Sequence, residues 1–245
     1  MKTHAHEVAE LRLESHEVHL WWRRVDAGHF LDDTRGWLSD EERRRGERFR
    51  REEDALAFVA RRLFLRGTLA RYVGRPPGAL CFSEGPHGKP SLVDSGGIEF
   101  SLSRAGAWAL LGVARGRALG VDVERLDARL AQAEELSRLA ARVLTSGESA
   151  ELEALAPASR AGAFLQLWAR KEALLKALGT GLSLEPDTVE VGLAGLGPLA
   201  SRSVGHELFP RGGAELVDLL APAGYVASVV AEGARWELAV CNRAA

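Results

Sequence analysis

The sequence predicts an α+β fold made of two similar α/β lobes, residues 1–117 and 118–245. Signals for a strand, helices and several strands run through the first half, and signals for helices and then strands run through the second. The 245 residues suffice for two halves of roughly 120 residues, each with a core of its own. No linker rich in Gly, Pro or Ser separates the halves, so we expect them to pack tightly.

The first half begins with the stretch HEVHLWWRRV at 16–25, whose alternation indicates a strand. Ser39 precedes three acidic residues and is a good N-cap for a helix. Residues 54–74 carry apolar residues at helical spacing and end in a glycine, with two prolines just beyond. Turns separate the strand signals that follow, at 79–83, 98–102, 107–114 and 118–124.

The second half should start with helices at about 130–144, 147–156 and 159–179. Ser146 and Ser159 are the expected N-caps, and Pro157 is expected to break the helical run. Strands should follow at about 187–193, 214–220, 224–231 and 235–241.

The composition is that of a globular protein, because 46% of the residues are hydrophobic and 27% are charged. No apolar run reaches the length of about 18 residues that a membrane span needs, and the polar N-terminus MKTHAHEVAE does not resemble a secretory signal. Cys81 and Cys241 lack metal-ligand spacing and lie in strand-like runs, so we expect buried free thiols. We therefore expect a cytoplasmic protein in a reducing compartment.

The charge is unevenly distributed, although the net charge is only −2. Residues 43–75 hold eleven arginines against four acids, whereas residues 122–190 hold twelve acids against eight bases. A basic segment facing an acidic one suits a phosphorylated ligand held together with a metal ion. A nucleic-acid surface is not expected, because acids interrupt the arginine run and few aromatic residues lie within it.

The predicted strand at 118–124 contains GVDVE, in which Asp122 and Glu124 face one side and the two valines the other. One interpretation is a half-exposed strand with a polar outer face. The other is that the two carboxylates, which repel each other unless a cation lies between them, provide oxygen ligands for Mg²⁺.

The last predicted helix contains WARKEALLKALGTGL at 168–182, where charged residues interrupt an apolar stripe. Lys171 falls inside the stripe and therefore needs a partner or an exit to water. Glu172 and Lys176 have the i, i+4 spacing of a surface ion pair, which is worth about 0.3–0.5 kcal/mol. Alternatively, Glu172 is a third carboxylate and general base, and Lys176 binds phosphate.

Two turns precede these segments. Gly88-Lys89-Pro90 leads into a strand, and FSLSRAGAWALLG at 100–112 places Ser103 and Arg104 at the tip of a hairpin. Such a tip can offer a hydroxyl, backbone N–H groups and a guanidinium to a phosphate. Each segment alone is equally typical of an ordinary turn.

In this order and spacing, the segments resemble the 4′-phosphopantetheinyl transferase superfamily, in particular its larger, two-lobed members that act on nonribosomal peptide and polyketide synthases. The resemblance covers roughly residues 36–230. Its most specific parts are Gly120-Val-Asp122-Val-Glu124 and Trp168-x-x-Lys171-Glu172-Ala-x-x-Lys176-x-x-Gly179-x-Gly181-Leu182.

The resemblance implies two lobes related by a pseudo-two-fold axis, with the active site at their interface. It also implies coenzyme A as co-substrate and Mg²⁺ as cofactor, in a protein expected to act as a monomer. The serine of an apo carrier protein would attack the β-phosphorus of coenzyme A, take the phosphopantetheine arm and release 3′,5′-ADP.

The residue roles follow from the matched motifs. Asp122, Glu124 and Glu172 match the Mg²⁺ ligands, and Glu172 and Lys176 are the implied catalytic residues. Arg45 and Arg62 are added to the coenzyme A site from the basic helical segment. The residues expected to bind coenzyme A are Arg45, Arg62, Lys89, Pro90, Ser103, Arg104, Asp122 and Lys176.

One position departs from the family pattern, because many members have Ser-His where this chain has Ser103-Arg104. An arginine can bind a 3′-phosphate with two hydrogen bonds, but it does not titrate as a histidine does. This departure permits one alternative, a degenerate accessory module that binds coenzyme A or a synthase. Another Mg²⁺-dependent phosphoryl or pyrophosphate enzyme is a second, independent alternative. The intact Asp122, Glu124, Glu172 and Lys176 argue against the accessory module.

Overall fold

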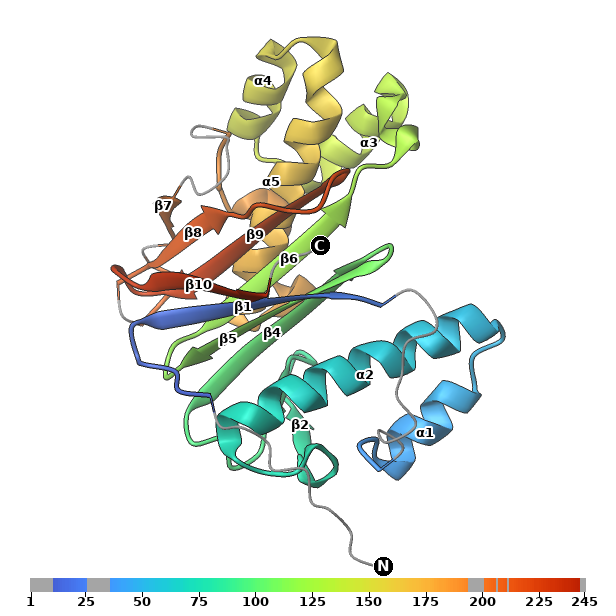
Figure 1. Ribbon diagram of the computed structural model, residues 1–245. Helices are drawn as coiled ribbons and strands as arrows, with labels where there is room; N and C mark the ends of the chain where they lie inside the picture. Colours follow the sequence, from blue (N-terminus) through green and yellow to red (C-terminus); the bar gives the residue numbers. More distant parts are fainter. Residues whose placement is uncertain (1–10, 26–35, 194–200, 206, 211, 243–245) are drawn as a thin grey trace, which may run out of the picture.

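The computed structural model describes residues 11–25, 36–193, 201–205, 207–210 and 212–242, and over these residues the fold is α+β, as predicted (Figure 1). The helices are α1 (Asp40–Glu47), α2 (Glu52–Val73), α3 (Ala133–Val143), α4 (Ser146–Ala154) and α5 (Pro157–Leu178), with short 3-10 helices η2 (Pro77–Ala79), η3 (Ala128–Ala131), η4 (Gly181–Ser183) and η5 (Pro186–Thr188). The strands are β1 (Glu17–Arg24), β2 (Phe82–Glu84), β3 (Pro90–Leu92), β4 (Ile98–Ala105), β5 (Trp108–Arg115), β6 (Leu119–Arg125), β7 (Ser201–Val204), β8 (Ala214–Asp218), β9 (Tyr225–Glu232) and β10 (Glu237–Asn242).

Two four-stranded sheets form the centre of the molecule. Sheet 1 has the order β10-β1-β5-β4 and sheet 2 the order β6-β9-β8-β7, while β2 and β3 form a separate hairpin. One apolar core lies between the sheets. Helix α2 packs on the outer face of sheet 1 and α5 on the outer face of sheet 2, so the layers run helix, sheet, sheet, helix (Figure 1).

The central strands supply both cores that flank them, because side chains alternate along a strand. Leu110 of β5 belongs to the core between the sheets, whereas Leu111 faces α2. In β9, Val229 faces the other sheet and Val230 faces α5. Strands covered on both faces show nearly continuous apolar runs, which is the pattern of this sequence.

The last described strand returns to the first sheet. β10 pairs in parallel with β1, beside which it lies in Figure 1. The side-chain amide of Asn242 donates to the backbone oxygen of Trp22 at 2.7 Å and accepts from its nitrogen at 2.8 Å. The division between residues 117 and 118 stays a prediction, and sheet 1 takes strands from both sides of it.

The first two helices begin and end with the expected signals. Ser39 caps α1 through a capping box with Glu42. Gly74 ends α2 in the left-handed conformation, with φ of 62°. These two helices therefore have the local sequence signals that we identified.

Two predicted N-caps are wrong. The N-cap of α4 is Thr145, one residue before Ser146, because its hydroxyl accepts the backbone N–H of Glu148 at 3.1 Å in a capping box. Ser159 lies inside α5, because Pro157 occupies the start of that helix instead of breaking the run. Proline fits a first helical turn, where its missing N–H costs no hydrogen bond.

The strand predicted at 187–193 does not form. Val189, Val191 and Leu193 are buried, which explains the strand-like pattern of the sequence. Side chains, and not a neighbouring strand, accept the hydrogen bonds of the backbone N–H groups in this segment. The carboxylate of Glu148 accepts the N–H groups of Val191 at 2.8 Å and Gly192 at 3.1 Å.

Lys171 finds its partner inside the same region. Its side chain is 1% exposed and lies 2.7 Å from the carboxylate of Glu148. The ammonium also donates to the backbone oxygens of Pro186, at 2.8 Å, and Val189. These bonds use all three ammonium donors, so Lys171 connects α5, α4 and the following loop.

Two expectations drawn from composition can be compared with the structure. Among the described residues, no helix combines the length and the apolarity needed to cross a membrane.

The expectation of buried thiols is wrong, because Cys81 and Cys241 are both exposed. Cys81 precedes the small β2–β3 hairpin and Cys241 lies on the edge strand β10. A strand-like sequence does not distinguish an edge from a central strand.

Strand β6 and helix α5 touch at the backbone level. A Cβ atom added to Gly120 would lie 1.9 Å from the carbonyl oxygen of Ala173 and 2.4 Å from the nitrogen of Ala177. Only glycine permits this approach. The contact places the GVDVE strand directly against the helix that carries Glu172 and Lys176.

We predict that Gly120→Ala lowers the free energy of unfolding by at least about 1–3 kcal/mol, because backbone atoms must move apart to accept the methyl group. Urea denaturation measures this change. Gly162→Ala is the matched control, since a Cβ there would meet nothing within 4 Å. It should leave stability unchanged or raise it by up to about 1 kcal/mol. Equal stability of the two variants would contradict the prediction.

Candidate active site

Strand β6 and helix α5 bring together the four charged residues at the centre of the sequence prediction. Lys176 Nζ lies 2.5 Å from Asp122 Oδ1 and 3.8 Å from Glu172 Oε2. Glu124 follows Asp122 on the same face of β6, and the charges of Asp122, Glu172 and Lys176 all act on it. Two segments far apart in the sequence therefore form one cluster, which we call the carboxylate cluster: Asp122, Glu124, Glu172 and Lys176.

Asp122 is the most buried member, with 2% of its surface exposed. Its Oδ1 accepts hydrogen bonds from Lys176 and, at 2.7 Å, from the hydroxyl of Ser103. Its Oδ2 is buried and has no hydrogen-bond partner among the described residues. Burial raises the pKa of Asp122, and Lys176 and Ser103 oppose this change. A buried, unpaired carboxylate oxygen is costly unless a cation or a donor reaches it.

The negative charges of Glu124 and Glu172 are also not balanced by neighbouring positive charge. Burial and the neighbouring charge of Asp122 raise the pKa of Glu124 to about 7, although Trp168 Nε1 donates to its Oε1 at 2.9 Å. Burial likewise raises the pKa of Glu172, and Lys176 only partly compensates. Three acids thus share a single lysine, which leaves the cluster with an excess of negative charge.

The chemistry of this cluster fits a divalent cation. Carboxylate oxygens are the ligands that Mg²⁺ prefers, and the free Oδ2 of Asp122 offers one of them. Over the described ranges, however, no three His, Cys, Asp or Glu side chains form a group ready to hold a metal ion. Lys176 occupies the Oδ1 side of Asp122, so Oδ2 is the oxygen of Asp122 that remains for a cation.

The β4–β5 hairpin brings only one of its two predicted residues to the cluster. Ser103 is 7% exposed. Besides donating to Asp122, its hydroxyl accepts from Lys176 at 3.2 Å and from the backbone of Val123 at 3.4 Å. Arg104, the next residue, is exposed, as the alternation of a strand requires.

Three other predicted residues line a cavity of about 480 Å³ between α1, α2 and the β2–β3 hairpin, which we call the arginine cavity. Arg45 is exposed and its guanidinium lies over the ring of Phe58 at 5.5 Å. Arg62 lies over Phe82 at 4.9 Å. Pro90 contributes to the wall beside them. Guanidinium groups beside aromatic rings suit a phosphorylated ligand that carries a flat base.

Sequence reasoning missed two residues that organise this cavity. Glu42 pairs with Arg62 and, at 2.7 Å, with Arg66. Arg66 is 3% exposed and also donates to the backbone oxygen of Pro77 at 2.8 Å. The signal was present, because Arg66 follows Arg62 by four residues on one helix face. Trp168 was likewise part of the motif, but its bond to Glu124 was not foreseen.

Lys89 lies between the two groups of residues. Its ammonium donates to the backbone oxygens of Leu119, at 3.1 Å, and Ala177, at 3.3 Å. It thus ties the start of β6 to the end of α5, and burial lowers its pKa. Lys89 does not line the arginine cavity, but its neighbour Pro90 does. The loop before β3 therefore connects the carboxylate cluster with that cavity.

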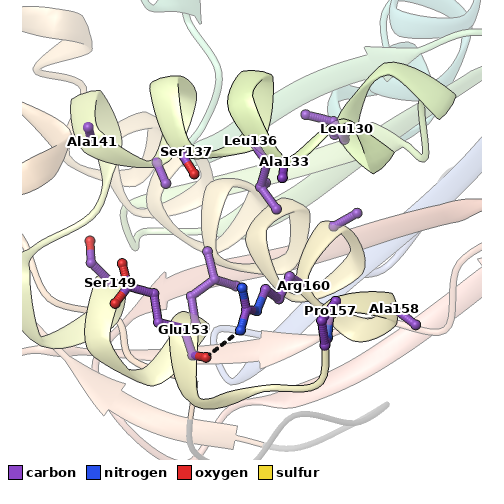
Figure 2. Close-up of a pocket in the computed structure, with 13 residues that line it drawn as sticks. Leu130, Ala133, Leu136, Ser137, Ala141, Ser149, Glu153, Pro157, Ala158 and Arg160 are labelled. Atoms are coloured by element: carbon purple, nitrogen blue, oxygen red, sulfur yellow. Dashed lines mark hydrogen bonds between the residues drawn. The ribbon is translucent and has the colours of Figure 1, made fainter.

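A further cavity of about 450 Å³ lies between α3, α4 and the start of α5 (Figure 2). Its wall is mostly alanine and leucine, and none of the predicted site residues line it. Arg160 enters it but donates to the backbone oxygens of Glu153 and Leu155. This cavity has no part in the candidate site.

Comparison with known proteins identifies relatives of the segment that carries the cluster. The model of the 4′-phosphopantetheinyl transferase superfamily matches residues 118–230. A Synechocystis protein named as a 4′-phosphopantetheinyl transferase is 40% identical over 148 residues, which cover 60% of this chain and 58% of that protein. A 4′-phosphopantetheinyl transferase of Bacillus subtilis is 28% identical over 64% of this chain and 66% of its own length. A phosphopantetheinyl transferase of Thraustochytrium is 30% identical over 67% of this chain and 62% of its own length. The chain thus matches less than two thirds of the length of each of these relatives.

We predict that Glu124→Gln stabilises the protein at pH 8 when no divalent cation is present. The pKa of Glu124 is about 7 in the folded protein against an ordinary 4.5. Between these values the folded protein holds a proton that the unfolded chain has released, so the free energy of unfolding falls as the pH rises through this window. The variant should gain up to about 3 kcal/mol at pH 8, less any solvent screening, and the gain should disappear near pH 4.

Urea denaturation across this pH range measures the effect. Glu134→Gln, an exposed carboxylate on α3, should keep the wild-type pH profile. If Glu124→Gln also keeps that profile, Glu124 does not carry the raised pKa.

Proposed function

We propose that the chain, whose residues 118–230 match the model of the 4′-phosphopantetheinyl transferase superfamily, transfers 4′-phosphopantetheine from coenzyme A to a serine of an apo carrier protein. The observation that carries the proposal is the carboxylate cluster, in which Lys176 Nζ lies 2.5 Å from Asp122 and 3.8 Å from Glu172. This arrangement has the parts that phosphoryl-type transfer needs: carboxylates for a metal, a mobile cation and a candidate base.

Three residues of the chain act directly in the proposed reaction. Glu172 takes the proton of the carrier serine, directly or through a water molecule, and burial, which raises its pKa, makes it a better base than an ordinary glutamate. The serine oxygen forms a bond to the β-phosphorus of coenzyme A, the pyrophosphate bond breaks, and 3′,5′-ADP leaves. Lys176, which is 31% exposed, turns from Asp122 to the pyrophosphate oxygens and stabilises their charge.

Asp122, Glu124 and Glu172 are the proposed ligands of Mg²⁺. The bound ion would neutralise charge on the pyrophosphate during transfer. The free Oδ2 of Asp122 and the raised pKa of Glu124 support this assignment, because both indicate carboxylates that lack a cation. Trp168 holds one oxygen of Glu124 and leaves the other available.

The arginine cavity is the proposed site of the nucleotide part of coenzyme A. Arg45 and Arg62 supply guanidinium groups for the 3′-phosphate, and Pro90 forms part of the wall. Arg104 is exposed at the end of β4 and is proposed to add a third guanidinium. Lys89 belongs to the loop that joins this cavity to the carboxylate cluster, a position that suits a ligand spanning both.

Two finer assignments are part of the same proposal. The layered arrangement, with one long helix on the outer face of each sheet, supports a pseudo-two-fold relation between lobes at residues 1–117 and 118–245. The resemblance of the motifs at 120–124 and 168–182 to those of two-lobed family members supports carrier domains of nonribosomal peptide or polyketide synthases as acceptors.

The first test is a measurement of intact mass. Purified protein is mixed with coenzyme A, Mg²⁺ and apo carrier domains of several types, and each carrier is weighed. A gain of one phosphopantetheine group that EDTA prevents supports the proposal. No gain on any carrier, with coenzyme A still bound, favours an accessory binding module. Cleavage of coenzyme A without a carrier favours a hydrolase.

We predict that Glu172→Gln keeps the fold and lowers turnover by about 10²–10³-fold, the usual cost of removing one group that acts in the transition state. The mass assay gives the rate and circular dichroism verifies the fold. Glu134→Gln, the exposed carboxylate on α3, serves as the control and should keep full turnover. Undiminished turnover in Glu172→Gln would remove Glu172 from the mechanism.

We predict that Arg45→Gln raises KM for coenzyme A about tenfold, because it removes one charge-assisted bond to the 3′-phosphate. KM for dephospho-coenzyme A, which lacks that phosphate, should not change. Arg44→Gln is the matched control, since Arg44 is exposed on the same helix and does not line the cavity. An equal rise in KM for both substrates would mean that Arg45 does not contact the 3′-phosphate.

A further inference from the structure

The edges of the two sheets meet along a seam that two serines of β4 close. β4 is the edge strand of sheet 1 and β6 is the edge strand of sheet 2. The backbone N–H of Val121 donates to Ser101 Oγ at 3.0 Å, and that of Val123 donates to Ser103 Oγ at 3.4 Å. Both serines are buried, at 6% and 7% exposure. Hydroxyl groups thus bond to β6 where a neighbouring strand would otherwise do so.

Ser103 differs from Ser101 in its further contacts. Its hydroxyl donates to Asp122 Oδ1 at 2.7 Å and accepts from Lys176 at 3.2 Å. A serine hydroxyl has one hydrogen to donate and two lone pairs, and the contacts with Asp122, Lys176 and the backbone of Val123 use them all.

The Ser103 bond fixes how the Asp122 carboxylate is turned. Oδ1 faces Ser103 and Lys176, whereas Oδ2 is buried without a partner among the described residues. When Lys176 leaves Asp122 for the pyrophosphate, Ser103 is the side chain that keeps Oδ1 in place. Bonds of this kind from outer groups commonly orient metal ligands.

We propose that Ser103 is a positioning residue for the metal site: its hydroxyl orients Asp122 so that the free oxygen faces the divalent cation. The predicted contact of Ser103 with coenzyme A stays a separate prediction. The positioning role rests on the proposed function, because it takes Asp122 as a ligand of the metal.

Mn²⁺ binding to the full-length protein without coenzyme A tests the role directly. The electron paramagnetic resonance signal of free Mn²⁺ gives the dissociation constant. Ser103→Ala should weaken Mn²⁺ binding by about tenfold or more, the usual effect of removing a group that orients a metal ligand. Ser101→Ala is the matched control: it loses a seam bond from an equally buried serine but leaves the Asp122 contact intact, so its affinity should not change.

A second variant covers the case in which Ser103→Ala does not fold. Ser103→Cys keeps nearly the same size but replaces the hydroxyl with a weak donor, and it should weaken Mn²⁺ binding in the same direction. Urea denaturation should show a larger loss of stability for Ser103→Ala than for Ser101→Ala, because both give up one seam bond and Ser103→Ala also gives up its bonds to Asp122 and Lys176. Weaker Mn²⁺ binding by the folded Ser103→Ala, with unchanged affinity in Ser101→Ala, therefore supports the positioning role.

Three results would overturn it. Wild-type Mn²⁺ affinity in the folded Ser103 variants would mean that Ser103 is not needed to orient Asp122. Equal losses of Mn²⁺ affinity in the Ser101 and Ser103 variants would mean that the loss comes from the missing bond to β6. Weaker coenzyme A binding in EDTA, with unchanged Mn²⁺ affinity, would make Ser103 a nucleotide ligand.

The mass assay separates this inference from the function on which it rests. Transfer and Mn²⁺ binding by the wild type, without any effect of the Ser103 variants, would refute the positioning role alone. Absence of both transfer and Mn²⁺ binding in the wild type would refute the two proposals together.

Discussion

The approach of α5 to β6 at Gly120 is the constraint on which the rest of the structure depends. A side chain at this point would strike the helix backbone, so the strand and the helix can lie in contact only because the residue is a glycine. The contact brings the carboxylates of β6 next to Glu172 and Lys176. It also creates an electrostatic problem, since three acids are forced together around one lysine, and burial raises their pKa values. In the proposed enzyme, substrate and metal would solve this problem.

The buried charged residues on α5 and on the strand β6 beside it fall into two groups that their hydrogen bonds distinguish. Arg170 forms two hydrogen bonds with Asp218, at 2.6 and 3.0 Å, and Lys171 has three acceptors. Buried charges that are fully paired in this way hold a fold together, and removing one partner leaves the other uncompensated. Asp122 on the adjoining strand β6, by contrast, keeps a buried oxygen that has no hydrogen-bond partner among the described residues. Incomplete pairing therefore distinguishes the candidate site from the structural charges of the neighbouring helix.

The sequence was sufficient for the elements whose signals are local. Ser39 begins α1 and Gly74 ends α2 where expected, and Asp122, Glu172 and Lys176 lie together as the spacing of their motifs suggested. The sequence was insufficient where a contact with a residue far away in the chain determines the local structure. Residues 187–193 alternate like a strand, but a glutamate on α4 bonds to their backbone. Cys81, which precedes a small hairpin, and Cys241, which lies on an edge strand, are exposed, and no local pattern reveals this. For the same reason, only the structure identified Arg66 and Trp168 as partners of site residues.

The parallel pairing of β10 with β1 has a consequence for the order in which the protein is made. During synthesis, β1 leaves the ribosome early but lacks one neighbour until residues 237–242 have emerged. Sheet 2 involves strands between β6 and β9 and has no such delay. The half of the molecule that is translated first is thus completed last, with an open strand edge in the meantime, and such edges are the usual starting points of aggregation.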